Sequence, residues 1–318
     1  MGSKIKLLVT GGAGFIGSNT IKKLLDLDYF VVCVDNFNDY YNPKIKEKNI
    51  EKFLTNKNFK LYKEDICNFP KMEEIFKKEG FDKICHLAAR VGVRPSIKNP
   101  FLYEEVNVRG TLNMLELSKI YKIKNFVFAS SSSVYGNNKK IPFSESDNVD
   151  FPISPYAATK KTCELLAYTY HHLYNLKCTG LRFFTVYGPS GRPDMAPFLF
   201  VDAIYKGKEI KKFGDGTAKR DYTYIDDITS GIISAIEKDL DYEIINLGNN
   251  KPVELNYFIS LIEKLLNEKA IIKNYPKQLG DVDITYADIS KAQRLLNYDP
   301  KISIEEGMKK FVRWYLNS

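Results

Sequence analysis

Cysteine is scarce in this sequence and lacks the spacing that would give it a structural or metal-binding role. The five cysteines are an odd number, and none stands in a Cys-x-x-Cys pair or in a Cys/His pattern typical of zinc sites. Most lie inside apolar runs, so we predict reduced cysteines in the protein core and no bound metal. The five positions are Cys33, Cys67, Cys85, Cys163 and Cys178.

Long hydrophobic runs are missing as well. The longest apolar stretches are far shorter than the ~20 residues of a membrane-spanning helix, and no positively charged start with an apolar segment behind it precedes the first predicted strand. We therefore expect a soluble, cytoplasmic protein with no membrane partner. The chain also lacks internal repeats and flexible linkers, and its 318 residues, 44% of them hydrophobic, fit one large domain or two closely joined ones.

A basic stripe interleaved with aromatic residues is also absent, so we predict no nucleic-acid partner. Lys and Arg outnumber Asp and Glu by 47 to 39, which gives a formal net charge of +8. Lysines alternate with acids in segments such as 44–48 and 73–78, as on solvated helix faces. The excess of positive charge would still steer an anionic substrate toward the protein.

In the first half of the chain, short apolar runs alternate with segments of helical period. Unbroken apolar strands suit a parallel sheet that helices cover on both faces, connected by right-handed crossovers. This pattern predicts an α/β protein with a doubly wound parallel sheet of the Rossmann type. The predicted strands include residues 5–10, 30–34, 83–87 and 125–129, and the predicted helices include residues 16–27, 99–121 and 154–175.

The pattern changes after about residue 185, where proline and glycine interrupt shorter segments. We assign residues 1–185 to an NAD-binding Rossmann domain with a returning segment near 223–250. We assign residues 186–318 mainly to a smaller C-terminal α/β substrate domain. A strand at 243–247 is expected to rejoin the main sheet, and helices are expected outside it at 253–266 and 302–316.

A glycine-rich turn over residues 11–17 joins the first predicted strand to the first predicted helix. This is the context in which glycines bind a dinucleotide, because they permit a tight turn and a close approach of the pyrophosphate to the helix N-terminus. The alternative is an ordinary connection between strand and helix. The candidate cofactor contacts in the turn are Gly11, Gly14, Phe15, Ile16 and Gly17.

The second strand ends at Asp35, where a carboxylate can accept hydrogen bonds from an adenosine ribose. Its charge would repel a 2′-phosphate, so NAD is favoured over NADP as the cofactor, with Asn36 as a neighbouring contact. Asp65 and Ile66 follow the third strand and are candidates for contact with the adenine. Taken alone, Asp65 is also typical of a turn.

Tyr156 and Lys160 stand four residues apart in a predicted helix, hence on one face. A phenol is a poor base near neutral pH unless a nearby cation stabilises the phenolate, so we predict that Lys160 assists Tyr156 as a proton shuttle. A run of serines at 130–133 falls at the carboxyl edge of the sheet and can hold the reacting alcohol. The alternative is a solvent-side helical pair and a serine-rich turn.

Motifs along nearly the whole chain resemble those of extended short-chain dehydrogenase/reductases. They are TGGAGFIG, HLAA, SSSSVYG, YAATK and RDYTYIDD, at residues 10–17, 86–89, 130–136, 156–160 and 220–227. The resemblance implies that Ser131, Tyr156 and Lys160 are catalytic and that Ala88 contacts bound NAD. It also implies a homodimer joined by a four-helix bundle, to which segments 99–121 and 154–175 contribute.

Family members that eliminate water or carbon dioxide carry acidic residues before Val-Tyr-Gly, whereas this chain has Ser132 and Ser133. Without a carboxylate there, the simplest reaction is oxidation at C4 of the sugar, rotation of the ketosugar and return of the hydride to its other face. We therefore expect a nucleotide-sugar epimerase.

Three further segments, 37–47, 92–100 and 182–196, resemble UDP-glucuronate 4-epimerases, which interconvert UDP-glucuronate and UDP-galacturonate. The resemblance implies that Thr185, Ser132 and Ser133 form a hydroxyl-lined pocket for the C6 carboxylate. Arg94 or Arg192 would neutralise its charge, although either is also typical of a surface or phosphate-facing arginine.

For the rest of the UDP-sugar, the resemblance implies Arg220 at the diphosphate, Asp281 at the uridine ribose and Phe213 over the uracil. Other activities remain open: a 4-epimerase for UDP-glucose or UDP-N-acetylhexosamine, a UDP-glucuronate decarboxylase, or an NAD-binding protein without catalysis.

Overall fold

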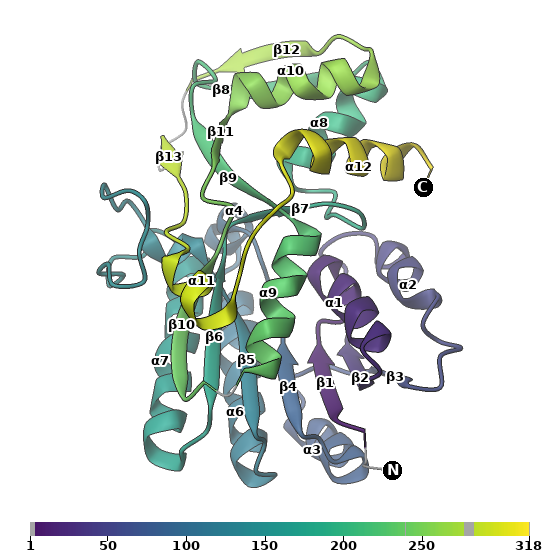
Figure 1. The fold of residues 1–318 in the computed structure, drawn as a ribbon, viewed down its shortest axis with the longest axis vertical. Helices are drawn as coiled ribbons and strands as arrows, with labels where there is room; N and C mark the ends of the chain where they lie inside the picture. The colour runs from purple at the N-terminus through teal and green to yellow at the C-terminus, as the bar shows by residue number, and fades with distance from the viewer. Residues whose placement is uncertain (1–3, 239, 277–282, 318) are drawn as a thin grey trace.

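A seven-stranded parallel sheet forms the centre of the fold (Figure 1). The structure is a computed structural model that describes residues 4–238, 240–276 and 283–317. The strand order β10-β6-β5-β4-β1-β2-β3 reverses beside β1, which confirms the predicted doubly wound sheet and places a ligand crevice at the carboxyl ends of β1 and β4. The strands are β1 (Lys6–Thr10), β2 (Phe30–Asp35), β3 (Phe59–Lys63), β4 (Lys83–His86), β5 (Asn125–Ser131), β6 (Cys178–Phe183) and β10 (Tyr242–Leu247).

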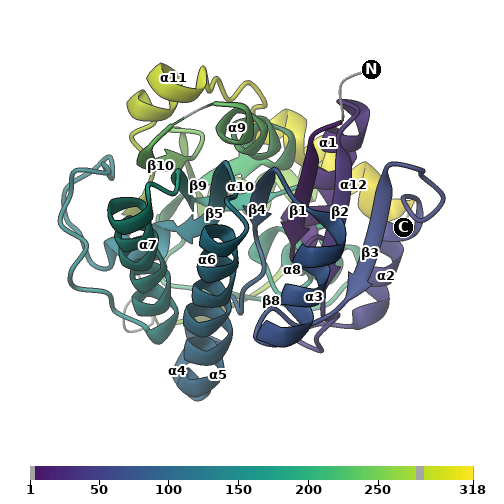
Figure 2. The same ribbon diagram turned by 90° about the horizontal axis from the view of Figure 1, so that it is seen from below.

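Helices cover both faces of this sheet (Figure 2). Side chains alternate along each strand, so Leu7 and Val9 enter one hydrophobic core while Leu8 enters the other. Burial on both faces explains why these strands are apolar throughout. One face carries α3 (Phe69–Glu79), α6 (Gly110–Ile120) and α7 (Pro155–Tyr174), and the other carries α1 (Phe15–Asp26), α9 (Ile225–Glu237) and α11 (Ser290–Leu296), with α2 (Pro43–Glu51) beside α1.

A smaller lobe stands over the carboxyl edge of the sheet (Figure 1). It contains a four-stranded sheet of β7 (Thr185–Tyr187), β9 (Lys219–Tyr224), β11 (Pro252–Glu254) and β13 (Ile284–Thr285), and a two-stranded sheet of β8 (Glu209–Phe213) and β12 (Ile271–Tyr275). Its helices are α8 (Ala196–Tyr205), α10 (Leu255–Leu266) and α12 (Ile304–Leu316). The chain returns to the main sheet through α9 and β10, and again through α11.

The predicted elements of the second half are found close to their expected positions. The strand expected at 243–247 is β10, which pairs parallel with β6. The helices expected at 253–266 and 302–316 are α10 and α12. The helix α10 begins slightly later than expected because the residues before it form the short strand β11.

The single helix expected at 99–121 is interrupted in the structure. It is divided into α5 (Pro100–Tyr103), a π-helical segment η1 (Glu104–Arg109) and α6, after the short helix α4 (Val93–Lys98). The wider π turn accommodates Asn107, whose buried amide donates to Thr159 Oγ1 at 3.0 Å and accepts from the backbone N–H of Arg90 at 2.7 Å. No helix within the described ranges is long and apolar enough to cross a membrane.

The cysteines agree with the prediction from their spacing. All five are free, four of them are buried, and Cys67 is half-buried. Burial raises the pKa of the Cys85 thiol to about 12, so this group stays protonated at neutral pH. The four buried thiols are therefore packing residues of β2, β4, β6 and α7.

Candidate functional site

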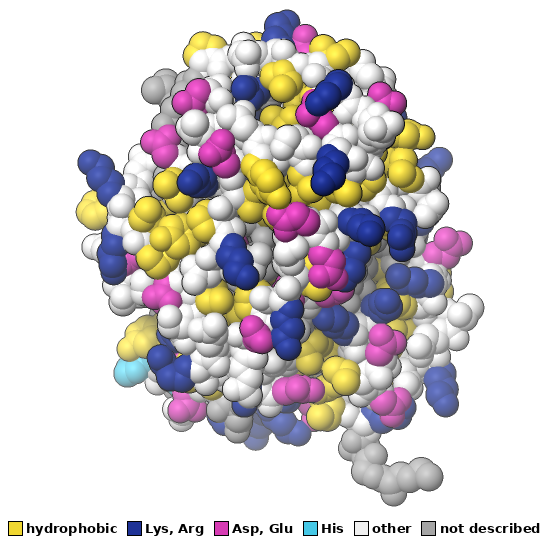
Figure 3. Space-filling model, turned by 45° about the horizontal axis from the view of Figure 1, so that its top comes forward, with side chains coloured by type: hydrophobic (Ala, Val, Ile, Leu, Met, Phe, Trp, Pro, Cys, Tyr) yellow, Lys and Arg dark blue, Asp and Glu magenta, His cyan; other side chains and the backbone are white. Residues whose placement is uncertain are grey.

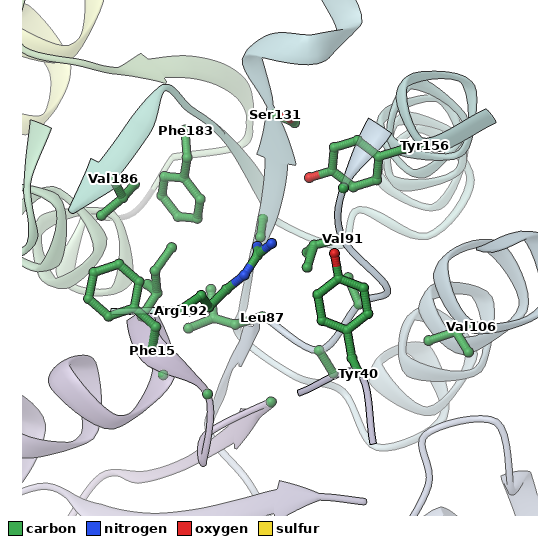
Figure 4. Close-up of a pocket in the computed structure, with 18 of the residues that line it drawn as sticks. Phe15, Tyr40, Leu87, Val91, Val106, Ser131, Tyr156, Phe183, Val186 and Arg192 are labelled. Carbon is green, nitrogen blue, oxygen red and sulfur yellow. The ribbon is translucent and has the colours of Figure 1, made fainter. Parts of the chain in front are cut away.

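A cavity of about 430 Å³ lies where the main sheet meets the small lobe (Figure 4). Its wall comes from the turn after β1, the ends of β2, β4 and β5, the helix α7 and the segment between β6 and α8. This is the position at which open α/β sheets bind ligands. Most predicted site residues line it: Gly11, Gly14, Phe15, Ile16, Gly17, Asp35, Asn36, Ile66, Ala88, Ser131, Ser132, Ser133, Tyr156, Lys160, Thr185 and Arg192.

The glycine-rich turn presents bare backbone to this cavity. Gly11 has a φ of +68°, and a Cβ there would lie 2.7 Å from backbone atoms of Ala88. A Cβ on Gly17 would lie 2.3 Å from the carbonyl oxygen of Gly11. Gly14 is the N-cap residue of α1. Because glycine has no side chain, it supplies no side-chain acceptor for the N–H groups of the first helical turn. The turn therefore fits the pyrophosphate of a dinucleotide.

Asp35 is held at the end of β2 by two backbone donors. The residue is 7% exposed, and its carboxylate accepts hydrogen bonds from the N–H groups of Ala13 at 3.0 Å and Phe37 at 2.9 Å. Burial raises the pKa of this carboxyl, while these bonds and the charge of Lys46 oppose the rise. The carboxylate is thus fixed to the glycine turn, in the position expected for contact with a ribose.

Asp65 is not among the residues that line the cavity, although its neighbour Ile66 is, and its contact with the adenine stays a prediction. Its Oδ2 accepts from Asn36 Nδ2 at 2.7 Å, and its Oδ1 accepts from the backbone N–H of Cys67 at 2.8 Å. These two bonds fix the carboxylate in the turn after β3, beside Asn36. Ile66, the next residue, is the one that faces the cavity.

Tyr156 and Lys160 enter the cavity from α7, as their spacing predicts. Both are buried, and Lys160 Nζ donates to the carbonyl oxygen of Ala129 at 2.8 Å. Ser131, the last residue of β5, accepts a hydrogen bond at Oγ from the N–H of Ser133 at 3.2 Å. Figure 4 shows the Tyr156 hydroxyl directed into the cavity, on the side to which Ser131 also belongs. A phenol, an ammonium and a hydroxyl therefore meet at one end of the cavity.

Arg192 supplies a cation on the opposite wall. Its guanidinium points into the cavity in Figure 4, and its side chain is 18% exposed. Arg192 forms a bidentate ion pair with Asp194, in which Nε donates to Oδ1 at 2.9 Å and Nη2 donates to Oδ2. The Tyr40 hydroxyl also donates to Asp194 Oδ2, at 3.1 Å. Burial opposes ionisation of Asp194, but the bonds from Arg192 and Tyr40 outweigh it and lower the pKa of the carboxyl. Thr185 lines the same cavity.

Among the described residues, the predicted substrate contacts Arg94, Phe213 and Arg220 do not line the cavity. Arg94 stacks over the ring of Phe213, with 5.5 Å from its guanidinium carbon to the ring centroid. Arg220 Nη1 donates to the carbonyl oxygen of Lys219 at 2.9 Å. Neither arginine lines the cavity in the described chain, and Asp281 lies outside the described residues. Between the two candidate arginines for a sugar carboxylate, the structure therefore favours Arg192.

The sequence did not single out several residues of the site. Tyr40 and Lys46 lie in a segment identified only by resemblance, and both line the cavity. His86 belongs to a recognised motif but had no assigned role: its ring bonds to Thr10 Oγ1 at 2.7 Å and to Thr111 Oγ1 at 3.1 Å. Burial, with a contribution from the charge of Lys160, lowers the pKa of His86 to about 3. The imidazole is therefore neutral and structural.

The geometry of this site agrees with what comparison with known proteins finds. A sequence model of the family described as GDP-mannose 4,6 dehydratase matches residues 8–311. The chain belongs to this family of extended short-chain dehydrogenase/reductases. Within it, the chain is 50% identical over 308 residues to UDP-glucuronate 4-epimerase from Thermodesulfobacterium geofontis. The aligned residues cover 96% of this chain and 95% of that protein.

Solved structures show the same similarity. The crystal structure of UDP-glucuronic acid 4-epimerase from Bacillus cereus in complex with UDP-glucuronic acid and NAD matches with a TM-score of 0.93 and 36% identity, over 98% of this chain and 99% of that one. The UDP-glucose 4-epimerase from Thermotoga maritima with UDP-glucose matches with a TM-score of 0.91 and 33% identity, over 98% and 99%. These matches confirm the predicted Rossmann fold.

Proposed function

We propose that this protein is an NAD-dependent UDP-glucuronate 4-epimerase, which interconverts UDP-glucuronate and UDP-galacturonate. The observation that carries the proposal is one cavity that holds both the Tyr156 and Lys160 pair and the guanidinium of Arg192. The pair suits proton transfer at a sugar hydroxyl, and the cation suits a carboxylate on the same sugar. Two of the relatives named above, from Thermodesulfobacterium geofontis and Bacillus cereus, have this activity in their names, which supports the assignment.

The catalytic step at C4 needs one hydride and one proton to leave the sugar and return. NAD, when bound, accepts the hydride and gives it back, so the reaction has no net redox change. Tyr156 removes the proton from O4 and returns it after the ketosugar has rotated. Ser131 holds O4 by a hydrogen bond, and Lys160, fixed by the carbonyl of Ala129, stabilises the phenolate form of Tyr156.

The carboxylate of the substrate needs firm binding because a 4-keto glucuronate is a β-keto acid. It loses carbon dioxide when the bond to its carboxylate aligns with the π system of the ketone. We propose that Arg192 and the hydroxyls of Thr185, Ser132 and Ser133 hold the carboxylate out of this alignment. All four side chains belong to residues that line the cavity.

The direct test is proton NMR of the sugar ring during incubation of the purified protein with UDP-glucuronate and no added NAD. We expect UDP-galacturonate to appear, which requires both the activity and a retained cofactor. Carbon dioxide as the main product would instead identify a decarboxylase. No reaction even after addition of NAD, together with turnover of UDP-glucose or UDP-N-acetylglucosamine, would assign the protein to neutral sugars.

Substitution of Arg192 by Met tests the proposed carboxylate contact. Since charge-assisted hydrogen bonds contribute ~1.5–3 kcal/mol, kcat/KM for UDP-glucuronate should fall ~10- to 150-fold. Inhibition by UDP-glucose, which has no carboxylate, should change less than ~3-fold, as judged by inhibition constants. Arg94→Met is the matched control and should leave both values close to wild type; a larger loss in that variant would transfer the carboxylate role to Arg94.

We also propose a homodimer formed through α6 and α7, which lie side by side on one face of the sheet (Figure 2). Their outer surface is unusually apolar for exposed helices. Four helices, two from each subunit, would bury this surface in a bundle. Exposed apolar side chains on the two helices are Leu112, Ile120, Leu165, Tyr168, Leu173 and Tyr174.

Substitution of Leu165 by Glu should convert the dimer to a monomer, because a buried, unpaired charge opposes association. Light scattering coupled to size-exclusion chromatography measures the mass. Leu165 and Leu54 are both 55% exposed, so Leu54→Glu, on the segment after α2, is the matched control and should leave the mass unchanged. A monomeric wild type would contradict the dimer.

We further propose a cytoplasmic location, which suits five free cysteines.

A further inference from the structure

A buried carboxylate close to the catalytic pair has no part in the proposed chemistry. Glu164 lies on α7, one helical turn beyond Lys160, and its side chain is 2% exposed. An ionised carboxylate in such a position is unfavourable unless it is paired and fully hydrogen-bonded. Glu164 is both, and its partners connect α7 to the strand end that carries Ser131.

Arg182, on the neighbouring strand β6, balances the charge of Glu164. Its Nε donates to Glu164 Oε1 and its Nη2 donates to Oε2, both at 2.8 Å, which is a bidentate pair. Arg182 Nη1 donates to the Tyr135 hydroxyl at 3.0 Å, and this hydroxyl donates to Asn246 Oδ1 at 2.7 Å. The carboxylate is therefore anchored from the sheet side and cannot reorient without breaking several buried bonds.

Glu164 has two further partners: Lys161, whose Nζ lies 3.8 Å from Oε2, and Ser130, which precedes the proposed catalytic Ser131. Ser130 Oγ donates to Glu164 Oε1 at 2.6 Å, and Lys160 Nζ donates to the carbonyl of Ala129 at 2.8 Å. Two consecutive residues at the end of β5 are thus bonded to two side chains on one face of α7. Tyr156 occupies the same face one turn earlier.

We infer that Glu164 is a positioning residue, which acts through Ser130 to fix Ser131 relative to Tyr156 for proton transfer at the substrate hydroxyl. The inference rests on the proposed function of Tyr156 and Ser131. Proton transfer requires heavy atoms within ~2.6–3.2 Å, and a misplacement of ~1 Å can lower a rate by ~10²-fold. Without the bond from Ser130 to Glu164, this strand end keeps its pairing with β6 and the bond from Lys160 but loses its second bond to α7, which would let it shift relative to Tyr156.

Ser130→Ala is the decisive variant because it removes the link to β5 and leaves the Glu164 and Arg182 pair intact. We expect kcat for UDP-glucuronate to fall ~10- to 100-fold, while the dissociation constant of UDP, measured by calorimetry, stays within ~2-fold of wild type. The matched control is Ser118→Ala on α6. It also removes a buried serine hydroxyl, which donates to the Met114 carbonyl at 2.6 Å, and should keep wild-type kcat.

Hydrogen exchange gives a second readout that does not depend on turnover. Backbone amides of residues 131–136 should exchange faster in Ser130→Ala than in wild type or Ser118→Ala. Glu164→Gln should show the same exchange and the same loss of kcat if it folds; Ser130→Ala decides the matter if it does not. Two results in Ser130→Ala would overturn the inference. One is a wild-type kcat, and the other is a loss of affinity for UDP as large as the loss of kcat.

Failure of the proposed function would be visible separately. A wild-type protein that does not epimerise UDP-glucuronate rejects the proposed substrate, and the kcat comparison is then made on the nucleotide sugar that it does turn over. If it turns over none, the exchange measurement alone decides: unchanged amide exchange at 131–136 in Ser130→Ala would reject positioning by Glu164, and faster exchange would support it.

Discussion

Replacement of Tyr156 by Phe is expected to lower kcat by ~10³-fold or more while the protein stays folded and keeps its ligands. The substitution removes only the hydroxyl that exchanges a proton with the sugar, and general acid–base catalysis by one side chain is worth ~10²–10⁴-fold. The ring itself keeps its edge-to-face packing against Tyr103, at 6.3 Å between centroids. The measurement is kcat by NMR, with bound NAD and UDP affinity determined on the same preparation.

A second Tyr→Phe variant separates chemistry from folding. Tyr62 lies on β3, and its hydroxyl donates to Glu79 Oε1 at 2.6 Å, outside the cavity. Tyr62→Phe should therefore keep wild-type kcat, even if its melting temperature falls slightly. Near-normal turnover in a folded Tyr156→Phe protein would remove Tyr156 from the catalytic step, and Ser131 or a bound water would have to carry the proton.

The fold and one half of the site could be predicted from local patterns. Apolar strand runs, the glycine-rich turn over residues 11–17 and Asp35 are short-range signals, and each depends on a few neighbouring residues. The four-residue spacing of Tyr156 and Lys160 follows in the same way from helical periodicity. The structure brings all of them to the carboxyl edge of the sheet, as the doubly wound topology requires.

The other half depends on contacts between distant segments, which periodicity does not encode. Tyr40 and Asp194 meet across the cavity although one follows β2 and the other follows β7. The same holds for Glu164 and Arg182, which are ordinary charged residues in the sequence and a buried ion pair in the fold. Asp65 also depends on context: its carboxylate accepts a hydrogen bond from the N–H of Cys67 in the local turn, and its contact with the adenine stays a prediction.

Replacement of Gly11 by Ala is expected to abolish retention of NAD. This loss and the loss of kcat in Tyr156→Phe are the two largest effects that we expect. The new Cβ would lie 2.7 Å from the Cα and N atoms of Ala88, in the turn after the neighbouring strand β4. These are backbone atoms, which cannot rotate away as a side chain can. Relief requires the turn after β1 to separate from the turn after β4, and both turns line the proposed cofactor site. The measurement is the amount of NAD released per subunit by denaturation of the purified protein, expected to fall at least ~10-fold.

Gly80→Ala separates this close contact from the conformational strain of a non-glycine residue at positive φ. Gly80 has a φ of +63°, close to the +68° of Gly11, but a Cβ there would meet nothing within 4 Å. Both variants place a non-glycine residue at positive φ, which is unfavourable, whereas only Gly11→Ala adds the clash with Ala88. Gly80→Ala should therefore lose some thermal stability and keep its NAD. Equal NAD content in the two variants would show that the packing of Gly11 against Ala88 does not shape the cofactor site.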